Sequence, residues 1–381
     1  MTIHAAPTPS LNSLVRAIVG VRQPRCVPWL GSKGPERSVR FYSRGRWAIY
    51  GGVRRSLERR GKTDGVVWLP DYLCSEAVTQ LRRPELSLYY YPIQGDLSPD
   101  WDAINSQSAG SCPPDIFVLV HYFGFHNCIG EAKAFCARHN ADLLEDCAHL
   151  LIPASGCGET TAVFCPHKFL PLPEGSLLTF AREPNVSNTD QIFESDKTSI
   201  LSWMAARLAQ RLMLSIGMSW DGFRQRSSPT SRPGGTDKQT ARPRMVPDKY
   251  ALKLLGVLEA DLGRVFRQRR KHYSLLAQAI AGVDYVEPLF ATLPDSACPY
   301  VFPMLVQNGR DGLDARLRDC GVPSSDWPNL PAEVTKHPRA HKIAIWMQQH
   351  ILVLPVHQDL SGKQMDYLTL TLKRLLGERA G

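Results

Sequence analysis

The sequence lacks any run of about 18 consecutive apolar residues, so it predicts no membrane-spanning helix. Residues 1–10 lack the basic start and apolar stretch of a secretory signal peptide. No two of the ten cysteines have the C-x-x-C spacing of a zinc or redox site, so we expect no metal centre. Because no secretory signal is seen, we expect a cytoplasmic protein with reduced thiols. Zinc-finger spacing, aromatic RNA-binding motifs and internal repeats are also missing, so we expect no nucleic-acid partner.

The composition is that of an ordinary globular chain. Of its 381 residues, 43% are hydrophobic and 21% are charged, and the length predicts two or three domains, or a large domain with a smaller one. The formal net charge is +9, and arginines cluster at 54–55, 59–60 and 267–271. Two explanations stay open for these clusters: solvated helix faces, or attraction of an anionic partner such as a phosphorylated substrate, an acidic carrier or a membrane surface.

From residue 45 to about residue 180, short apolar runs alternate with helical patterns. The predicted strands are 65–69, 86–91, 115–120, 142–145, 161–164 and 176–180, and the predicted helices between them are 49–60, 75–82 and 129–139. Alternation of this kind predicts an α/β fold with a largely parallel sheet. The strand runs are nearly continuous in apolar residues, as expected for strands buried on both faces.

The rest of the chain predicts an N-terminal arm and a second domain. Residues 1–40 are rich in Pro, Gly and Ser, which favours an arm; residues 41–245 form the large domain; and residues 246–381 form a smaller α+β domain. The apolar helical pattern at 198–218 indicates core or a subunit contact, with a membrane-surface role as the alternative. The basic, Pro/Gly-rich segment within 224–245 predicts a loop that is either a linker or an active-site flap. In the second domain we expect a long helix from 247 to 280, a strand at 300–306, a helix at 313–320, a strand near 351–357 and a final helix at 363–376.

Asp146 and Lys168 are the residues most suggestive of chemistry. Asp146 directly follows the predicted strand 142–145, and Lys168 follows the predicted strand 161–164. In a doubly wound sheet, ligands bind outside the carboxyl ends of the strands, so both side chains are expected at one edge. A lysine amine and a carboxylate are the groups that a pyridoxal phosphate (PLP) site most needs: the amine holds the aldehyde, and the carboxylate keeps the pyridine nitrogen protonated. Glu145 is expected to point to the opposite face.

A phosphate also needs hydrogen-bond donors. The turn Ser43-Arg-Gly-Arg-Trp47 runs directly into a predicted helix. A Gly-containing turn at a helix N-terminus offers free backbone N–H groups and a favourable dipole to an anion, although many such turns bind nothing.

An ordered set of motifs resembles the DegT/DnrJ/StrS family of PLP-dependent aminotransferases. The set covers residues 40–378 and consists of Gly45-Arg-Trp-Ala-Ile-Tyr50, Leu69-Pro-Asp-Tyr-Leu-Cys74, Val120-His-Tyr-Phe-Gly124, Glu145-Asp-Cys-Ala-His149, His167-Lys168 with Pro173-Glu-Gly175, Arg269-Arg-Lys-His-Tyr273 and Leu354-Pro-Val-His-Gln358. The resemblance implies the aspartate-aminotransferase fold (fold type I), with a large domain built on a mostly parallel sheet and a smaller C-terminal α+β domain.

The resemblance also implies roles for individual residues. Lys168 would hold PLP as a Schiff base and move a proton during catalysis, Asp146 would pair with the pyridine nitrogen, and His149 would lie near the phenolic oxygen. The remaining implied cofactor contacts are the phosphate-binding helix start at Gly45, Arg46 and Trp47, the ring-facing segment with Tyr72 and Cys74, and the strand end at His121.

The chain departs from the family pattern near the lysine. Cys165 stands where the family has a serine that contacts the phosphate. Because a thiol is a weak hydrogen-bond donor, other residues must supply part of the phosphate binding. A few family members replace the lysine by histidine and catalyse dehydration, and here His167 precedes Lys168. The family's partner-subunit asparagine has no clear counterpart in 224–245; Arg232, Arg242 and Arg244 are possible substitutes.

The resulting functional expectation is an aminotransferase that moves an amino group from a donor, glutamate, to a ketone acceptor. In the resembled family the acceptor is typically a nucleotide-linked keto sugar used in polysaccharide or antibiotic biosynthesis, and the enzymes are usually homodimers. Two alternatives stay open: a non-catalytic regulatory or assembly protein of the same fold, and a PLP-dependent sugar dehydratase.

Overall fold

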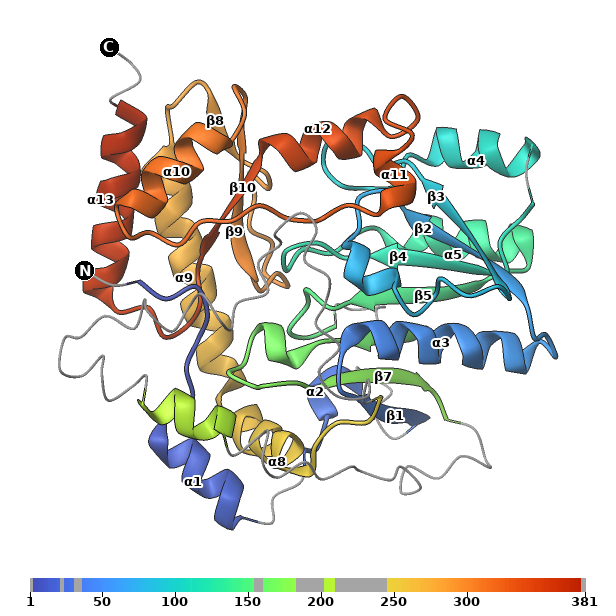
Figure 1. Cartoon of the computed structure of the whole chain (residues 1–381), viewed down its shortest axis with the longest axis horizontal. Helices are drawn as coiled ribbons and strands as arrows, with labels where there is room; N and C mark the ends of the chain where they lie inside the picture. Colours follow the sequence, from blue (N-terminus) through green and yellow to red (C-terminus); the bar gives the residue numbers. More distant parts are fainter. Residues whose placement is uncertain are drawn as a thin grey trace.

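The computed structural model describes residues 3–20, 24–30, 36–110, 112–153, 160–182, 202–209 and 245–377 (Figure 1). A seven-stranded sheet forms the large domain, in the order β1-β7-β6-β5-β4-β2-β3. Its strands are β1 (Arg37–Tyr42), β2 (Gly65–Pro70), β3 (Leu86–Tyr91), β4 (Ile116–Val120), β5 (Asp142–Cys147), β6 (Thr161–Phe164) and β7 (Ser176–Ala181). Strands β3, β2, β4, β5 and β6 run parallel, while β7 is antiparallel to β6 and β1 is antiparallel to β7. The predicted α/β fold with a largely parallel sheet is confirmed.

Burial explains why the strands could be read from sequence. Every residue of β4 is buried, and β5 and β6 are buried apart from their first residues. Helices that cover this sheet are α3 (Gly45–Arg59), α4 (Trp101–Gly110) and α5 (Ile129–His139) (Figure 1). Because both faces of the central strands are covered, their sequences are nearly continuous in apolar residues.

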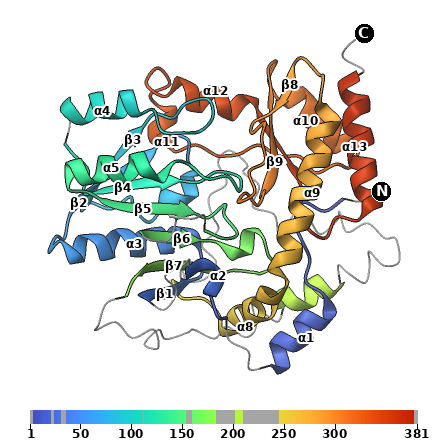
Figure 2. The ribbon, with the colours of Figure 1, turned by 180° about the vertical axis from the view of Figure 1, so that it is seen from behind.

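The segment before the sheet contains more regular structure than an arm. It includes α1 (Leu11–Val19) and α2 (Val27–Leu30), and residues 37–40 already belong to β1. Helix α1 lies beside α8 (Lys249–Leu258) and beside the short helical stretch 202–209, in both views (Figures 1 and 2). The stretch 202–209 is the only part of the predicted helix 198–218 that lies within the described residues, and residues 224–244 of the predicted loop lie outside them.

Two predicted helices differ in the structure. Residues 75–82 form a single 3-10 turn, Ser75–Val78, followed by further i→i−3 turns, and the amide of Ser75 bonds to the carbonyl of Asn329 in the second domain. The predicted helix 247–280 is divided at Glu259–Asp261 into α8 and α9 (Leu262–Ile280). At this break the Glu259 carboxylate accepts the backbone amides of residues 25 and 26. Long-range contacts, which local pattern does not reveal, thus accompany both differences.

The small domain is built on α9 and a three-stranded antiparallel sheet, in the order β10-β9-β8 (Figure 2). Its further elements are β8 (Val286–Pro288), β9 (Val301–Val306), α10 (Asp311–Asp319), α11 (Ala332–Thr335), α12 (Lys342–His350), β10 (Ile351–Pro355) and α13 (Gly362–Gly377). Helix α9 spans from the neighbourhood of α8 to the small sheet (Figure 1). Among the described residues, no helix combines the length and apolarity needed to cross a membrane.

The small domain docks on the loops that follow the parallel strands. The amide of Tyr300 donates to the carbonyl of Phe123 at 2.8 Å, just after β4. The Tyr72 hydroxyl, just after β2, donates to the carbonyl of Trp327 at 2.6 Å. The carboxyl ends of the strands therefore face a wall supplied by the second domain, and this places a site between the two.

Candidate functional site

Asp146 projects from β5 on the side opposite to Glu145, as strand alternation predicts. The Asp146 carboxylate is buried, and its Oδ1 accepts the backbone amide of Ala148 at 2.9 Å. Burial raises the pKa of Asp146, while the positive charge of Lys168 and the Ala148 amide act in the opposite direction. A buried carboxylate with a raised pKa is poised to accept a cationic partner.

Lys168 ends a 3-10 turn, Pro166–Lys168, directly after β6. Its Nζ lies 5.9 Å from the centroid of the Tyr300 ring. The charge of Lys168 lowers the pKa of Asp146, Cys165 and Cys74, which burial raises, and adds to burial in lowering the pKa of His149. Lys168 therefore acts electrostatically on four of the other predicted site residues.

His167 is turned away from this group. Its Nδ1 donates to the carbonyl of Gly175 at 2.9 Å, and burial lowers its pKa to about 3. Of the two adjacent candidates, Lys168 is the one whose charge acts on Asp146. The geometry thus favours the lysine as the functional residue and argues against the histidine-based dehydratase alternative.

His149 presents a buried donor to the site. The Phe123 amide donates to its Nδ1 at 3.3 Å, so the neutral ring carries its proton on Nε2. Burial and the Lys168 charge lower the pKa of His149 well below its ordinary value, which keeps the ring neutral. Its Nε2 is buried and has no hydrogen-bond partner among the described residues. A buried donor without a partner is uncommon, and it marks a place where a ligand atom can bind.

Aromatic side chains enclose His149. Its ring stacks on Tyr300 with centroids 4.9 Å apart and on Phe123 with centroids 5.7 Å apart, while Trp327 meets it edge-on at 4.8 Å. Sequence reasoning missed Phe123, Tyr300 and Trp327 as site residues. For Tyr300 and Trp327 no local signal exists, because both come from the small domain; Phe123 could have been noted as a neighbour of His121 in the Val120–Gly124 motif.

Tyr72 and Cys74 differ in their burial and in their contacts. The Tyr72 ring is fully buried between Tyr122 and Trp327, with centroids 5.9 and 5.5 Å away, and its hydroxyl is committed to the carbonyl of Trp327. Cys74 is half-buried, and the charge of Lys168 acts on its thiol. Cys74 is therefore the better placed of the two to face a ligand held by Lys168.

The N-terminus of α3 lies beside Cys165, at the end of β6. Its N-cap residue, Arg44, makes no side-chain cap hydrogen bond, so the first helical amides are not capped from within the helix. A Cβ on Gly45 would lie 2.8 Å from the Sγ of Cys165, so only glycine lets the helix start approach this strand end. Arg46 is half-buried, and Trp47 is buried against Tyr50.

His121 supports the site from behind. Its Nε2 lies 3.1 Å from the Glu145 carboxylate, and its Nδ1 accepts the Asn127 amide at 3.0 Å. The imidazole, the Glu145 carboxylate and the Cys147 thiol lie within 4.8 Å of one another, and all three side chains are fully buried. The His121–Glu145 hydrogen bond already satisfies a buried carboxylate and a buried ring, so we assign this cluster a structural role.

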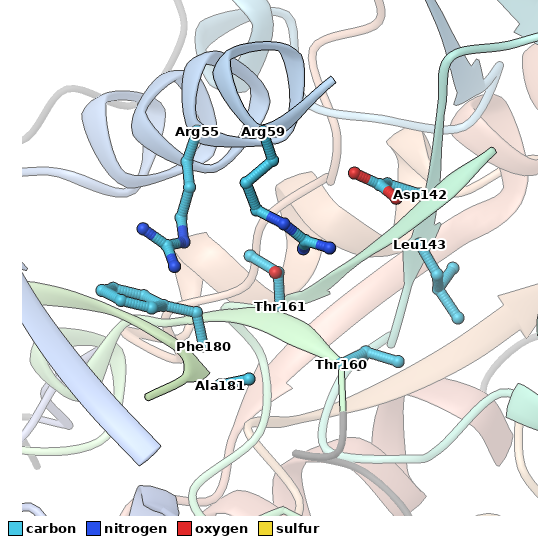
Figure 3. A pocket seen from close by; sticks show the side chains of 8 residues that line it. All are labelled: Arg55, Arg59, Asp142, Leu143, Thr160, Thr161, Phe180 and Ala181. Carbon is cyan, nitrogen blue, oxygen red and sulfur yellow. The ribbon is translucent and has the colours of Figure 1, made fainter. Parts of the chain in front are cut away.

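Two cavities lie away from these residues. One, of about 380 Å³, is lined by Arg55 and Arg59 of α3 and by Phe180 of β7, with the Arg55 guanidinium 3.7 Å from the centroid of the Phe180 ring (Figure 3). It lies at the amino end of β5, beside Asp142. A second, of about 460 Å³, lies between α1 and the α8–α9 junction. Neither is lined by Lys168, Asp146 or His149.

Solved structures show what this arrangement is similar to. The chain matches an aminotransferase, TlmJ, from Streptoalloteichus hindustanus over 100% of both chains, with 18% identity and a TM-score of 0.69. It matches a DegT DnrJ EryC1 StrS aminotransferase from Brucella abortus over 96% of both chains, with 18% identity and a TM-score of 0.66. It also matches Spr1654 from Streptococcus pneumoniae in its PLP form over 99% of both chains, with 14% identity and a TM-score of 0.69. No family model and no curated protein matches the sequence.

These likenesses confirm the predicted fold type I at full chain length. The residues present also fit the cofactor that this fold implies. Asp146 supplies a buried carboxylate, the partnerless Nε2 of His149 supplies a donor, and Gly45 leaves an open helix start beside Cys165. Lys168 supplies the amine in the midst of them. These groups are chemically suited to hold PLP, and the start of α3 is suited to an anion.

Proposed function

We propose that this protein is a PLP-dependent aminotransferase of the DegT/DnrJ/StrS type. The observation that carries the proposal is the convergence of Lys168, Asp146 and His149 at the carboxyl ends of β5 and β6, in a fold shared over the full chain with aminotransferases. Bound PLP supplies an electron sink that stabilises negative charge on a substrate carbon.

Each residue has a defined task in this proposal. The Lys168 amine would hold the cofactor and would be placed to carry a proton to and from a substrate carbon. The Asp146 carboxylate would keep a pyridine nitrogen protonated. The Nε2–H of His149 would be available to donate to the cofactor's phenolic oxygen, because the Phe123 amide donates to Nδ1 and fixes this tautomer.

The aromatic wall has a supporting task. Trp327 and Tyr300 stand against His149 from the small domain, and we propose that the Tyr300 ring, whose centroid is 5.9 Å from the Lys168 Nζ, excludes water from one side of the amine. Exclusion of water strengthens the interaction between Lys168 and Asp146, because both charges then lie in a medium of low dielectric constant.

The proposed donor and acceptor rest on analogy with proteins of the same fold. Glutamate is the proposed amino donor, and a nucleotide-linked keto sugar is the proposed acceptor, since CalS13 from Micromonospora echinospora is described as a sugar aminotransferase and shares this fold. A net charge of +9 suits an acceptor that carries a diphosphate. We propose a cytoplasmic homodimer, as the resembled family implies.

The test is chemical attachment at Lys168. Purified protein is incubated with PLP, reduced with borohydride and digested, and the modified peptide is identified by mass spectrometry. We expect the adduct on Lys168, and a visible absorption band that glutamate bleaches. Lys168→Ala is expected to lose the band and to reduce amino transfer at least about 100-fold, the scale of a lost acid–base residue.

The exposed Lys336 provides the matched control, because Lys336→Ala removes a lysine without touching the site. A wild-type protein that takes up no PLP, or a Lys168→Ala variant that transfers amino groups at the wild-type rate, would disprove the proposal.

A further inference from the structure

Strand β7, which pairs with β6, carries a hydroxyl beside Cys165, the position at which the family resemblance implies a phosphate-binding serine. In the antiparallel pair of β6 and β7, Phe164 is opposite Leu177, so the register brings Cys165 opposite Ser176. The Sγ of Cys165 and the Oγ of Ser176 are 3.2 Å apart. Each side chain is 1% exposed, so the pair is buried as a unit.

This pair lies against the start of α3. The Cβ position of Gly45 is 2.8 Å from the Cys165 sulfur and 4.0 Å from the Ser176 oxygen. The charges of Arg44 and Lys168 act on the Cys165 thiol as well. An uncapped helix start and a buried hydroxyl thus lie together, within reach of the positive charges of Arg44 and Lys168 that act on the neighbouring thiol, and this combination favours an anion.

The two polar atoms are not equivalent as donors. Burial raises the pKa of Cys165 to about 11, so the thiol keeps its proton at neutral pH. A thiol is a weak donor and a poor partner for a phosphate oxygen, whereas a hydroxyl donates one strong hydrogen bond and accepts others. If the S–H donates to the Ser176 oxygen, the Ser176 proton is left for a ligand.

We propose that Ser176 is the positioning residue that binds the cofactor phosphate, in place of a hydroxyl at position 165. Its Oγ accepts the Cys165 thiol and donates to a phosphate oxygen at the start of α3. This inference rests on the proposed function, since it specifies how the same site holds PLP.

The experiment compares two forms of the cofactor. PLP and pyridoxal, which lacks the phosphate, are titrated separately into Ser176→Ala, and binding is followed by visible absorption. We expect the Kd for PLP to rise about 10- to 100-fold, as for a lost hydrogen bond to a charged group, and the Kd for pyridoxal to stay within about twofold of wild type. Cys165→Ser in the Ser176→Ala background is expected to restore most of the PLP affinity, because it returns a hydroxyl to the neighbouring position.

Two further variants serve as controls for the role of the Ser176 hydroxyl. Ser176→Cys keeps a polar side chain of similar size with a weaker donor, and we expect an intermediate PLP affinity even if Ser176→Ala fails to fold. Ser38→Ala removes another buried serine, on β1 of the same sheet, and is expected to leave both affinities unchanged.

The outcomes separate the two proposals. Equal weakening of PLP and pyridoxal in Ser176→Ala, or no weakening of either, would show that Ser176 only supports the fold and would overturn the inference while leaving the aminotransferase assignment standing. A wild-type protein that binds neither compound would overturn both.

Discussion

At the scale of single residues, Asp146 shows the conflict between stability and function most clearly. Its burial raises its pKa, so the ionised form is unfavourable until a cationic ring nitrogen pairs with it. Asp146→Asn keeps an oxygen for the Ala148 amide but removes the charge. We therefore expect the cofactor-free variant to be more stable than cofactor-free wild type at neutral pH, and thermal unfolding with and without PLP measures this.

The sign of the pH dependence follows from the raised pKa. Above the unfolded value of about 3.9, folded Asp146 retains a proton that the unfolded chain releases, so the stability of the cofactor-free protein falls as pH rises toward the folded pKa. The advantage of Asp146→Asn should vanish below about pH 4 and be largest above the folded pKa. Saturating PLP at 100 times its Kd should stabilise wild type by about 2.7 kcal/mol and the variant by much less. Asp319→Asn, an exposed substitution, is expected to show neither effect.

At the scale of elements, the loop after β4 connects the two domains. Its Gly124 has a φ of +100°, and a Cβ there would lie 2.0 Å from the backbone oxygen of Cys298. Since that oxygen belongs to the backbone, it can yield only if the whole 298–300 segment shifts, so Gly124→Ala should push this segment away from Phe123. We expect a loss of more than about 3 kcal/mol in unfolding free energy, measured by urea denaturation.

Gly61 provides the comparison. It also has a positive φ, of +67°, but nothing lies within 4 Å of its Cβ position. Gly61→Ala therefore tests backbone strain alone and should cost only about 1 kcal/mol. Equal losses in the two variants would mean that the contact with the small domain contributes nothing.

The elements that sequence could predict are those whose signal is local. Strands β2 to β7 were predictable to within two residues at each end, because each contains a short, mostly apolar run and turn residues bound it. Strand β1 was missed, since its Arg37 and Ser38 are buried polar residues that interrupt any apolar pattern. Helix α4 was missed as well: its sequence, Trp101-Asp-Ala-Ile-Asn-Ser-Gln-Ser-Ala-Gly110, has weak helical periodicity and gains its order from packing against the sheet.

At the scale of the whole molecule, the site depends on contacts that no local pattern encodes. The sequence predicted Asp146 and Lys168 at one edge of the sheet, because parallel strands have their carboxyl ends at the same edge. The sequence did not predict the small-domain residues that contact His149. Trp327 reaches His149 only because its carbonyl is held by the Tyr72 hydroxyl and because the next segment bonds to Ser75. Separations of about 250 residues within such contacts lie outside any periodicity argument.

One buried side chain joins the small domain to the lysine loop. Arg269 of α9 is 1% exposed; its Nε donates to Gln358 at 3.0 Å, and its terminal nitrogens donate to the carbonyls of Tyr300 at 2.8 Å and Phe169 at 3.1 Å. Phe169 directly follows Lys168, so this guanidinium ties three segments together at the back of the site. Arg269→Lys keeps the charge but loses the planar fork, and we expect it to lower the unfolding free energy by about 3 kcal/mol or more.

Because the substitution loosens the lysine loop, it should act on cofactor binding as well as on stability. We expect Arg269→Lys to weaken PLP and pyridoxal alike, since the affected contact is at the lysine rather than at the phosphate; this pattern is the opposite of that expected for Ser176→Ala. Arg267→Lys, on the same helix but exposed, is the matched control and should change neither quantity. Unchanged pyridoxal binding in a destabilised Arg269→Lys protein would show that the small domain stabilises the fold without positioning Lys168. Loss of both stability and pyridoxal binding would show that the contacts of Arg269 with Gln358, Tyr300 and Phe169 determine both domain docking and the position of the Lys168 amine.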